Sequence, residues 1–297
     1  MRFELTVHTA LDELRMQMLG TQVLFGFQFQ GIFQDGFDTL SPIARVTALS
    51  AFGLLVLTLG CLVAPAAQHR LVEHGVATRR LFVTANRFAE LALVAYSLAM
   101  GFDVFVVSSA YWGMNWSVAA GCTAIVVALL LWYALGMIVG RPEEREAMPN
   151  RKEPALHEKI DQMLTEARVI LPGAQALLGF QFVVTLTKPF HALPAALQLA
   201  HFFALAAVLT AIVLLIAPAA VHRLAFEGQD SERMHDIGSN LITIALIPLA
   251  AGIATDVYVA LAKVVPVPVP WIGGGLSFAL LATLWYIVPL AIRARRS

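Results

Sequence analysis

Long apolar stretches alternate with short polar segments along the whole chain. A run of about 20 mostly apolar residues is long enough to cross a bilayer as an α-helix. Runs of this kind, with little or no charge, occupy residues 16–34, 46–68, 81–109, 115–139, 169–187, 195–220, 236–262 and 270–292. The pattern therefore predicts an all-α integral membrane protein with eight transmembrane helices.

A charged segment that contains prolines divides these runs into two groups of four. It covers residues 141–161 and reads RPEEREAMPNRKEPALHEKID. Because so many charges belong in water, we expect this segment to be a cytoplasmic linker. The predicted domains are a first four-helix repeat at 1–140, the linker at 141–161 and a second four-helix repeat at 162–297.

The two groups carry the same motifs at one constant offset. GTQVLFGFQF, which begins at Gly20, and GAQALLGFQF, which begins at Gly173, lie 153 residues apart and are identical at seven of ten positions. The same offset relates APAAQHRL at 64–71 to APAAVHRL at 217–224. A constant offset indicates internal duplication. Since each half has an even number of spans, the halves insert the same way up, and we expect a pseudo-two-fold axis along the membrane normal.

These motifs resemble those of an uncharacterised bacterial family of membrane proteins. Its members carry a DELR-x-LLPG-x-Q-x-LFGF opening and an APAA-x-HR motif, and this chain has LDELR at 11–15 and LPGAQALLGF at 171–180. Members usually look like a single unit, so the resemblance implies that this chain is a tandem version. The first copy departs from the motif, because Leu19 stands where the second copy has Pro172. The resemblance implies no biochemical activity.

Composition and charge fit this prediction and orient it. Hydrophobic residues make up 59% of the 297 positions and charged residues 13%, with a mean hydropathy of +0.74, whereas a soluble domain has about a quarter charged residues. All but three of the 20 Lys and Arg residues fall on the side of the termini and the linker; the exceptions are Arg45, Lys188 and Lys263. The positive-inside rule then predicts cytoplasmic termini in a multi-pass protein of the bacterial inner membrane. No cleaved signal peptide is expected.

Polar residues kept at equivalent positions of both halves are the candidates for function. Asp103 and Asp256 lie within the third span of each half. An ionisable residue inside a span is costly and marks a functional site by default. We therefore consider the two aspartates candidates for one proton or cation site, with a structural hydrogen-bond acceptor as the alternative.

Two further repeated sets surround them. Amides inside a span need hydrogen-bond partners, so the repeated glutamines are either a polar lining along the pseudo-two-fold axis or hydrogen bonds between helices: Gln22, Gln28, Gln175 and Gln181. The charged set at the cytoplasmic ends of the first two spans is either a gate or a cluster of helix-end ion pairs: Glu13, Arg15, His69, Arg70, Glu166, Arg168, His222 and Arg223.

Motifs of common enzyme chemistries are missing from the sequence. It contains no GxxxxGK[ST], HExxH or GxSxG, the patterns of nucleotide binding, zinc proteolysis and serine hydrolysis. Cys61 and Cys122 lie inside spans without CxxC spacing. We therefore expect neither an enzyme nor a metal or cofactor site. The expected partners are the bilayer and a small ion or solute, not nucleic acid, and a homo-oligomer is left open.

Three functions remain compatible with the sequence. The leading hypothesis is an ion or proton channel or a small-solute transporter, because carboxylates and amides repeat inside the spans. The second is a non-transporting scaffold or accessory subunit, because several spans carry almost no charge. The third is a haem protein with His69 and His222 as axial ligands, although an arginine follows each histidine.

The charge bias generates a test of topology. In a background that lacks Cys61 and Cys122, we expect a cysteine at Trp112 to react with a membrane-impermeant maleimide added outside intact cells. Cysteines at Arg145 and Ser297 should react only after the cells are opened, because the basic side faces the cytoplasm. The reverse labelling pattern would contradict the predicted orientation.

Overall fold

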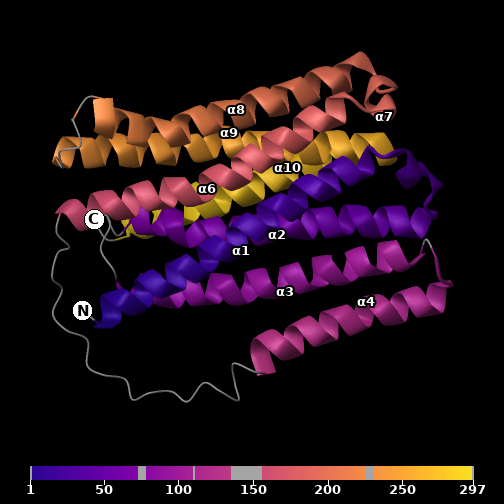
Figure 1. Cartoon of the computed structure of the whole chain (residues 1–297), viewed down its shortest axis with the longest axis horizontal. Coiled ribbons are helices and arrows are strands. Elements are labelled where there is room, and N and C mark those ends of the chain that lie inside the picture. The colour runs from indigo at the N-terminus through magenta and orange to yellow at the C-terminus, as the bar shows by residue number, and fades with distance from the viewer. Residues whose placement is uncertain are drawn as a thin grey trace.

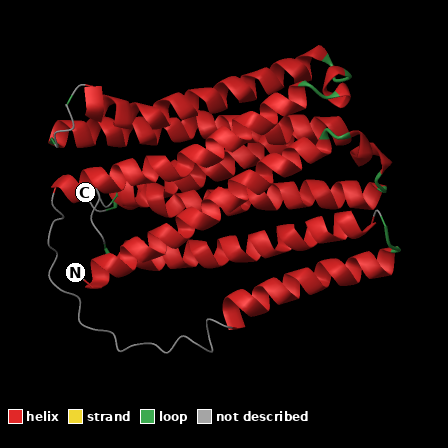
Figure 2. Ribbon diagram, in the orientation of Figure 1, coloured by secondary structure: helices red, strands yellow, loops and turns green. Residues whose placement is uncertain are grey.

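Every regular element in the described part of the chain is a helix (Figure 2). The computed structural model describes residues 2–72, 78–109, 111–134, 156–224, 226 and 231–295. For residues 2–16, 131, 134, 157, 158, 223 and 224 it describes the backbone alone. The first half contains α1 (Arg2–Ile32), the 3₁₀ helix η1 (Asp35–Thr39), α2 (Pro42–Leu71), α3 (Arg79–Ser109), α4 (Met114–Leu129) and the π-helical segment η2 (Leu130–Ala134). The second half contains α6 (Leu156–Thr185), α7 (Lys188–His191), α8 (Ala195–Leu224), α9 (Glu232–Val264), α10 (Val269–Ala282), the π-helical segment η3 (Thr283–Ile287) and α11 (Val288–Ala294).

The duplication predicted from the sequence is present in the secondary structure. The first and last residues of α8 lie 153 positions after the first and last residues of α2. The first and last residues of η3 lie 153 positions after those of η2. Even a hydrogen bond recurs: Tyr133 Oη donates to the carbonyl oxygen of Glu90, and Tyr286 Oη donates to that of Thr243. Helix α6 begins at Leu156, within the segment predicted as linker.

Within the part of the chain that the structure describes, six helices are long and apolar enough to span a membrane. They are α2, α3, the part of α6 over Lys159–Thr185, the part of α8 over Ala195–His222, α9 and the continuous segment Val269–Ala294. Helix α4 is apolar but has only 16 residues before the π-helical segment begins. The multi-pass character is therefore supported, and the predicted count of eight spans is not confirmed.

The helices form one elongated bundle (Figure 1). The start of α1 and the end of α11 lie at the same end of the bundle, while α8 and α4 lie at opposite edges. Helix α1 packs along α6, and α2 packs against α3 as well as against α9 and α10 of the other half. Helix α2 therefore lies at the centre of the bundle, where it contacts both halves.

The contacts of α2 make the bundle less symmetric than the predicted two-fold axis requires. Trp285 Nε1 donates a hydrogen bond to the carbonyl oxygen of Gly60, at 3.2 Å. The position equivalent to Gly60 in the second half is Val213, whose side chain is exposed. The equivalent tryptophan, Trp132, instead stacks on Tyr96. A glycine in only one copy thus allows the close approach of η3 to α2.

Small residues bring the third and fourth helices of each half together. A Cβ atom at Gly101 would lie 2.9 Å from the carbonyl oxygen of Gly121, and a Cβ atom at Gly274 would lie 3.1 Å from that of Ala254, where α9 and α10 cross. Small residues permit such backbone contact between membrane helices. Because Gly121 and Gly274 are equivalent, both halves use the same crossing.

This crossing generates a stability prediction. We expect Gly101→Leu to lower the unfolding temperature in detergent micelles, since overpacking of a close contact costs about 1–3 kcal/mol. Gly53→Leu is the matched control, because Gly53 lies on an exposed face of α2 with open space around it. Equal unfolding temperatures of the two variants would contradict the close packing of α3 on α4.

Candidate functional site

In the first half, the candidate aspartate is hydrogen-bonded to a candidate glutamine. Gln28 Nε2, on α1, donates to both carboxylate oxygens of Asp103, on α3, at 2.6 Å each. Both residues are half-buried. The amide satisfies part of the hydrogen-bonding capacity of the carboxylate but does not neutralise its charge. The negative charge of Asp103 is thus held on a membrane-spanning helix by a neutral partner.

The second half repeats this pair in a fully buried setting. Gln181 Nε2, on α6, donates to Oδ2 of Asp256, on α9, at 2.7 Å. Both side chains are completely buried. His201, on α8, adds a third group: its Nε2 lies 3.0 Å from the carbonyl oxygen of Gln181, and its Nδ1 lies 3.8 Å from Oδ1 of Asp256. Each aspartate is therefore held by the glutamine of its own half.

The two pairs differ in their access to space. Asp103 and Gln28 line a cavity of about 370 Å³ between α1, η1, α2 and α3. Among the described residues that line this cavity, Asp103 is the only charged one; the others include Phe37, Ala48 and Tyr111. The first pair can thus meet a ligand, whereas the second pair is enclosed by protein.

The four glutamines occupy different surroundings. Gln22 is buried where α1 crosses α6, and a Cβ atom at Gly173 would lie 1.5 Å from its Oε1. Its equivalent, Gln175, is exposed. Gln28 and Gln181 are directed to the aspartates, as described above. The structure therefore brings each of these two glutamines together with an aspartate and separates them from Gln22 and Gln175.

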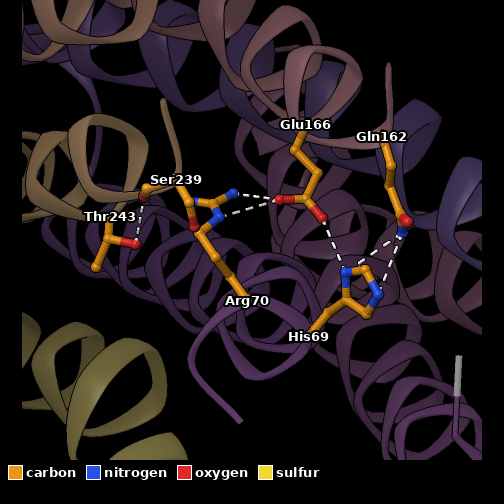
Figure 3. Close-up of polar contacts among 6 residues, drawn as sticks. All are labelled: His69, Arg70, Gln162, Glu166, Ser239 and Thr243. Carbon is orange, nitrogen blue, oxygen red and sulfur yellow. Dashed lines mark hydrogen bonds and ion pairs between the residues drawn. The ribbon is translucent and has the colours of Figure 1, made fainter. Parts of the chain in front are cut away.

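A second cluster joins the two halves through polar side chains of α2 and α6 (Figure 3). The guanidinium of Arg70, at the end of α2, binds the carboxylate of Glu166 on α6 through Nε, at 3.2 Å, and through Nη2. Nδ1 of His69 lies 3.1 Å from Oε1 of the same carboxylate. All three side chains are buried. An ion pair in such a position is strongly destabilising to break, because a buried charge is left uncompensated.

This cluster lines a cavity of about 310 Å³ between α2, α6, α9 and α11. Basic and acidic groups are mixed on its walls: His69, Arg70, Lys159, Glu166, His235, Asp236 and Arg293. Of the other predicted members, Arg168 is exposed and His222 is half-buried on α8. The side chains of Glu13, Arg15 and Arg223 lie outside the described residues. The cluster brings together groups from both halves. The positions of these residues in the sequence did not indicate that residues of the first half would pair with residues of the second.

The placement of His69 bears on the haem hypothesis. Nε2 of Gln162 lies 3.3 Å from each ring nitrogen of His69 (Figure 3). With Glu166 also at Nδ1, the ring is directed toward side chains of α6. This geometry does not support His69 as an axial ligand. Within the described residues, no three His, Cys, Asp or Glu side chains gather as a metal site would need.

Two residues of these sites were not predicted from the sequence. His201 has alanine at the equivalent position, Ala48, and Gln162 has threonine, Thr9. Both residues are present in one half alone, so they are not among the polar residues that the two halves share. A histidine inside the apolar run at 195–220 was the only sequence signal for His201.

Comparison with known proteins identifies the family. The model of a family of unknown function, DUF6328, matches the chain twice, over residues 2–136 and 151–289. The chain belongs to this family, and the two matches agree with a tandem duplication. Neither a curated protein nor a solved structure matches the chain.

The cluster at the end of α2 generates a prediction. We expect Glu166→Gln to destabilise the protein by about 3–5 kcal/mol, because Arg70 then remains buried without its counter-charge. Arg168→Gln, on the same helix but exposed, should change stability by less than about 0.5 kcal/mol. Reversible unfolding in detergent micelles measures both. Equal stabilities would show that the ion pair does not hold the halves together.

Proposed function

We propose that this member of the DUF6328 family is a membrane transporter that binds a small cationic solute at Asp103. One observation carries the proposal: a carboxylate on a membrane-spanning helix lines a cavity of about 370 Å³ and has a neutral amide as its hydrogen-bond partner. Acidic residues in such positions mark pathways of ions and substrates. The uncompensated charge favours a cation, a proton included, over an anion.

The packing between the halves favours a carrier over a channel. A pore on the predicted two-fold axis would run between α1 and α6. There, a Cβ atom at Gly26 would lie 2.1 Å from the ring of Phe180, and a Cβ atom at Gly173 would lie 1.5 Å from Oε1 of Gln22. Such contacts leave the two helices closely packed. The cavity at Asp103 lies instead within the first half, which supports a discrete binding site.

A scaffold without transport activity is the second candidate. It is favoured by the second half, where the same amide–carboxylate pair is enclosed and ties α6 to α9. In that case the pair in the first half would also serve only to join α1 to α3. The two functions make different demands on Asp103. A transporter of cations needs its negative charge, whereas a scaffold needs only its hydrogen bond.

Replacement of the two aspartates separates these functions. We expect Asp103→Asn to abolish cation-dependent or pH-dependent flux in proteoliposomes, since asparagine keeps the shape but removes the charge. The unfolding temperature should change little, because Gln28 can still donate to the asparagine oxygen. Asp256→Asn is the matched control, with flux close to wild type, because Asp256 is enclosed. A wild-type protein that moves neither protons nor monovalent cations nor small organic cations would contradict transport and support the scaffold.

A further inference from the structure

The second half holds a histidine side chain at the place where the first half has its cavity. His201 is equivalent to Ala48, which lines the cavity beside Asp103. The imidazole of His201 is fully buried, within 3.0 Å of the carbonyl oxygen of Gln181 and 3.8 Å of the carboxylate of Asp256. The same constellation of an aspartate and a glutamine therefore surrounds an imidazole in one half and a cavity in the other.

The aromatic surroundings correspond as well. The ring of Phe190 meets His201 edge to face, with 5.1 Å between the ring centroids. The equivalent phenylalanine, Phe37, lines the cavity of the first half. His201 is closed on another side by Phe29, which stacks on it at 5.6 Å and 17°. The equivalent of Phe29 is Phe182, which is 59% exposed. The cavity of the first half is thus lined by an equivalent phenylalanine, but no ring of the described residues closes it in the way that Phe29 closes the site of His201.

The polar atoms of the cavity require hydrogen-bond donors. Asp103 brings a negative charge, and Oε1 of Gln28 is buried without a hydrogen-bond partner in the described part of the chain. The ring of Tyr111 adds an aromatic surface, which attracts cations. The ring of Phe37 already has the ammonium of Lys263 over it, at 5.2 Å from the centroid. The volume lies in the range of pockets that hold small organic molecules, about 300–1,000 Å³. A ligand with N–H groups and a positive charge matches all of these features.

We propose that the cavity of the first half binds a small nitrogen-containing organic cation of the imidazolium type. His201 is then the covalently attached counterpart of this ligand in the second half. Access is open at one side, where Val107 is 64% and Tyr111 84% exposed. The assignment rests on the proposed function of Asp103 and names the chemical class of the solute. It also explains why the second pair is closed: its cavity is filled by the chain itself.

Titration with imidazole tests the assignment on the full-length protein, purified without imidazole. We expect calorimetry or saturation-transfer NMR in detergent micelles to detect binding to the wild type. Ala48→His should weaken binding by about tenfold or more, because the new side chain fills the cavity and takes the hydrogen bonds of the ligand. Asp103→Asn should weaken it similarly. Ser50→His, at an exposed position of the same helix, should leave binding unchanged.

A complementary variant creates the same site in the second half. His201→Ala should lower the unfolding temperature, because it removes a buried side chain, and added imidazole should raise that temperature more than it does for the wild type. A wild type that fails to bind imidazole overturns the assignment, whether or not His201→Ala is rescued. Binding that Ala48→His leaves intact overturns it too. The titration of wild type and Ala48→His decides the matter even if His201→Ala does not fold.

The outcomes distinguish this inference from the function on which it rests. Imidazole binding that is lost in Ala48→His, without flux in proteoliposomes, would support the ligand class and contradict transport. Asp103-dependent flux of an inorganic cation by a protein that does not bind imidazole would overturn the ligand class and leave transport standing.

Discussion

The hydrogen bond between a glutamine and an aspartate is the interaction on which both halves depend. A carboxylate inside a membrane must be hydrogen-bonded, because each unsatisfied polar group there costs several kcal/mol. The first helix of each half supplies the donor, from Gln28 to Asp103 and from Gln181 to Asp256. The bond fixes the rotation of the first helix against the third. The same rotation determines which faces of α1 and α6 are left to contact each other between the halves.

Fusion of two copies allows one site to change while the other is kept. In the second half, an imidazole fills the space beside the aspartate; in the first half, Ala48 leaves a cavity there. Phe29 of the first half covers His201, so the closed site also serves as part of the interface between the halves. A symmetric dimer of single units could not have one open and one closed site from identical chains without a difference in conformation.

The contact between the halves is polar at its ends and depends on shape in the middle. At the end of α9, Lys263 Nζ donates to the carbonyl oxygen of Ile32, at 2.6 Å, and to Oδ1 of Asp38, at 3.2 Å. Arg70 and Glu166 form the buried ion pair at the end of α2. Near the middle of the helix, Trp285 reaches the carbonyl oxygen of Gly60. The ion pair and the tryptophan contact both use α2. The tryptophan contact has no equivalent in the described part of α8, where Val213 stands in the place of Gly60. The close approach of η3 to α2 therefore depends on a glycine that only the first copy has.

The sequence by itself determined the helical membrane class, the duplication and the repeated polar positions, because these depend on local hydrophobicity and on a constant offset of 153 residues. It also identified Asp103 and Asp256 as residues whose burial needs an explanation. The tertiary structure alone decided which glutamine meets which aspartate, that Glu166 pairs with Arg70, and that His201 occupies the position of the first cavity. These pairings join residues 75 to 96 positions apart in some cases, and no periodicity along the chain encodes them. They depend on the rotation and depth of each helix, which side-chain packing sets.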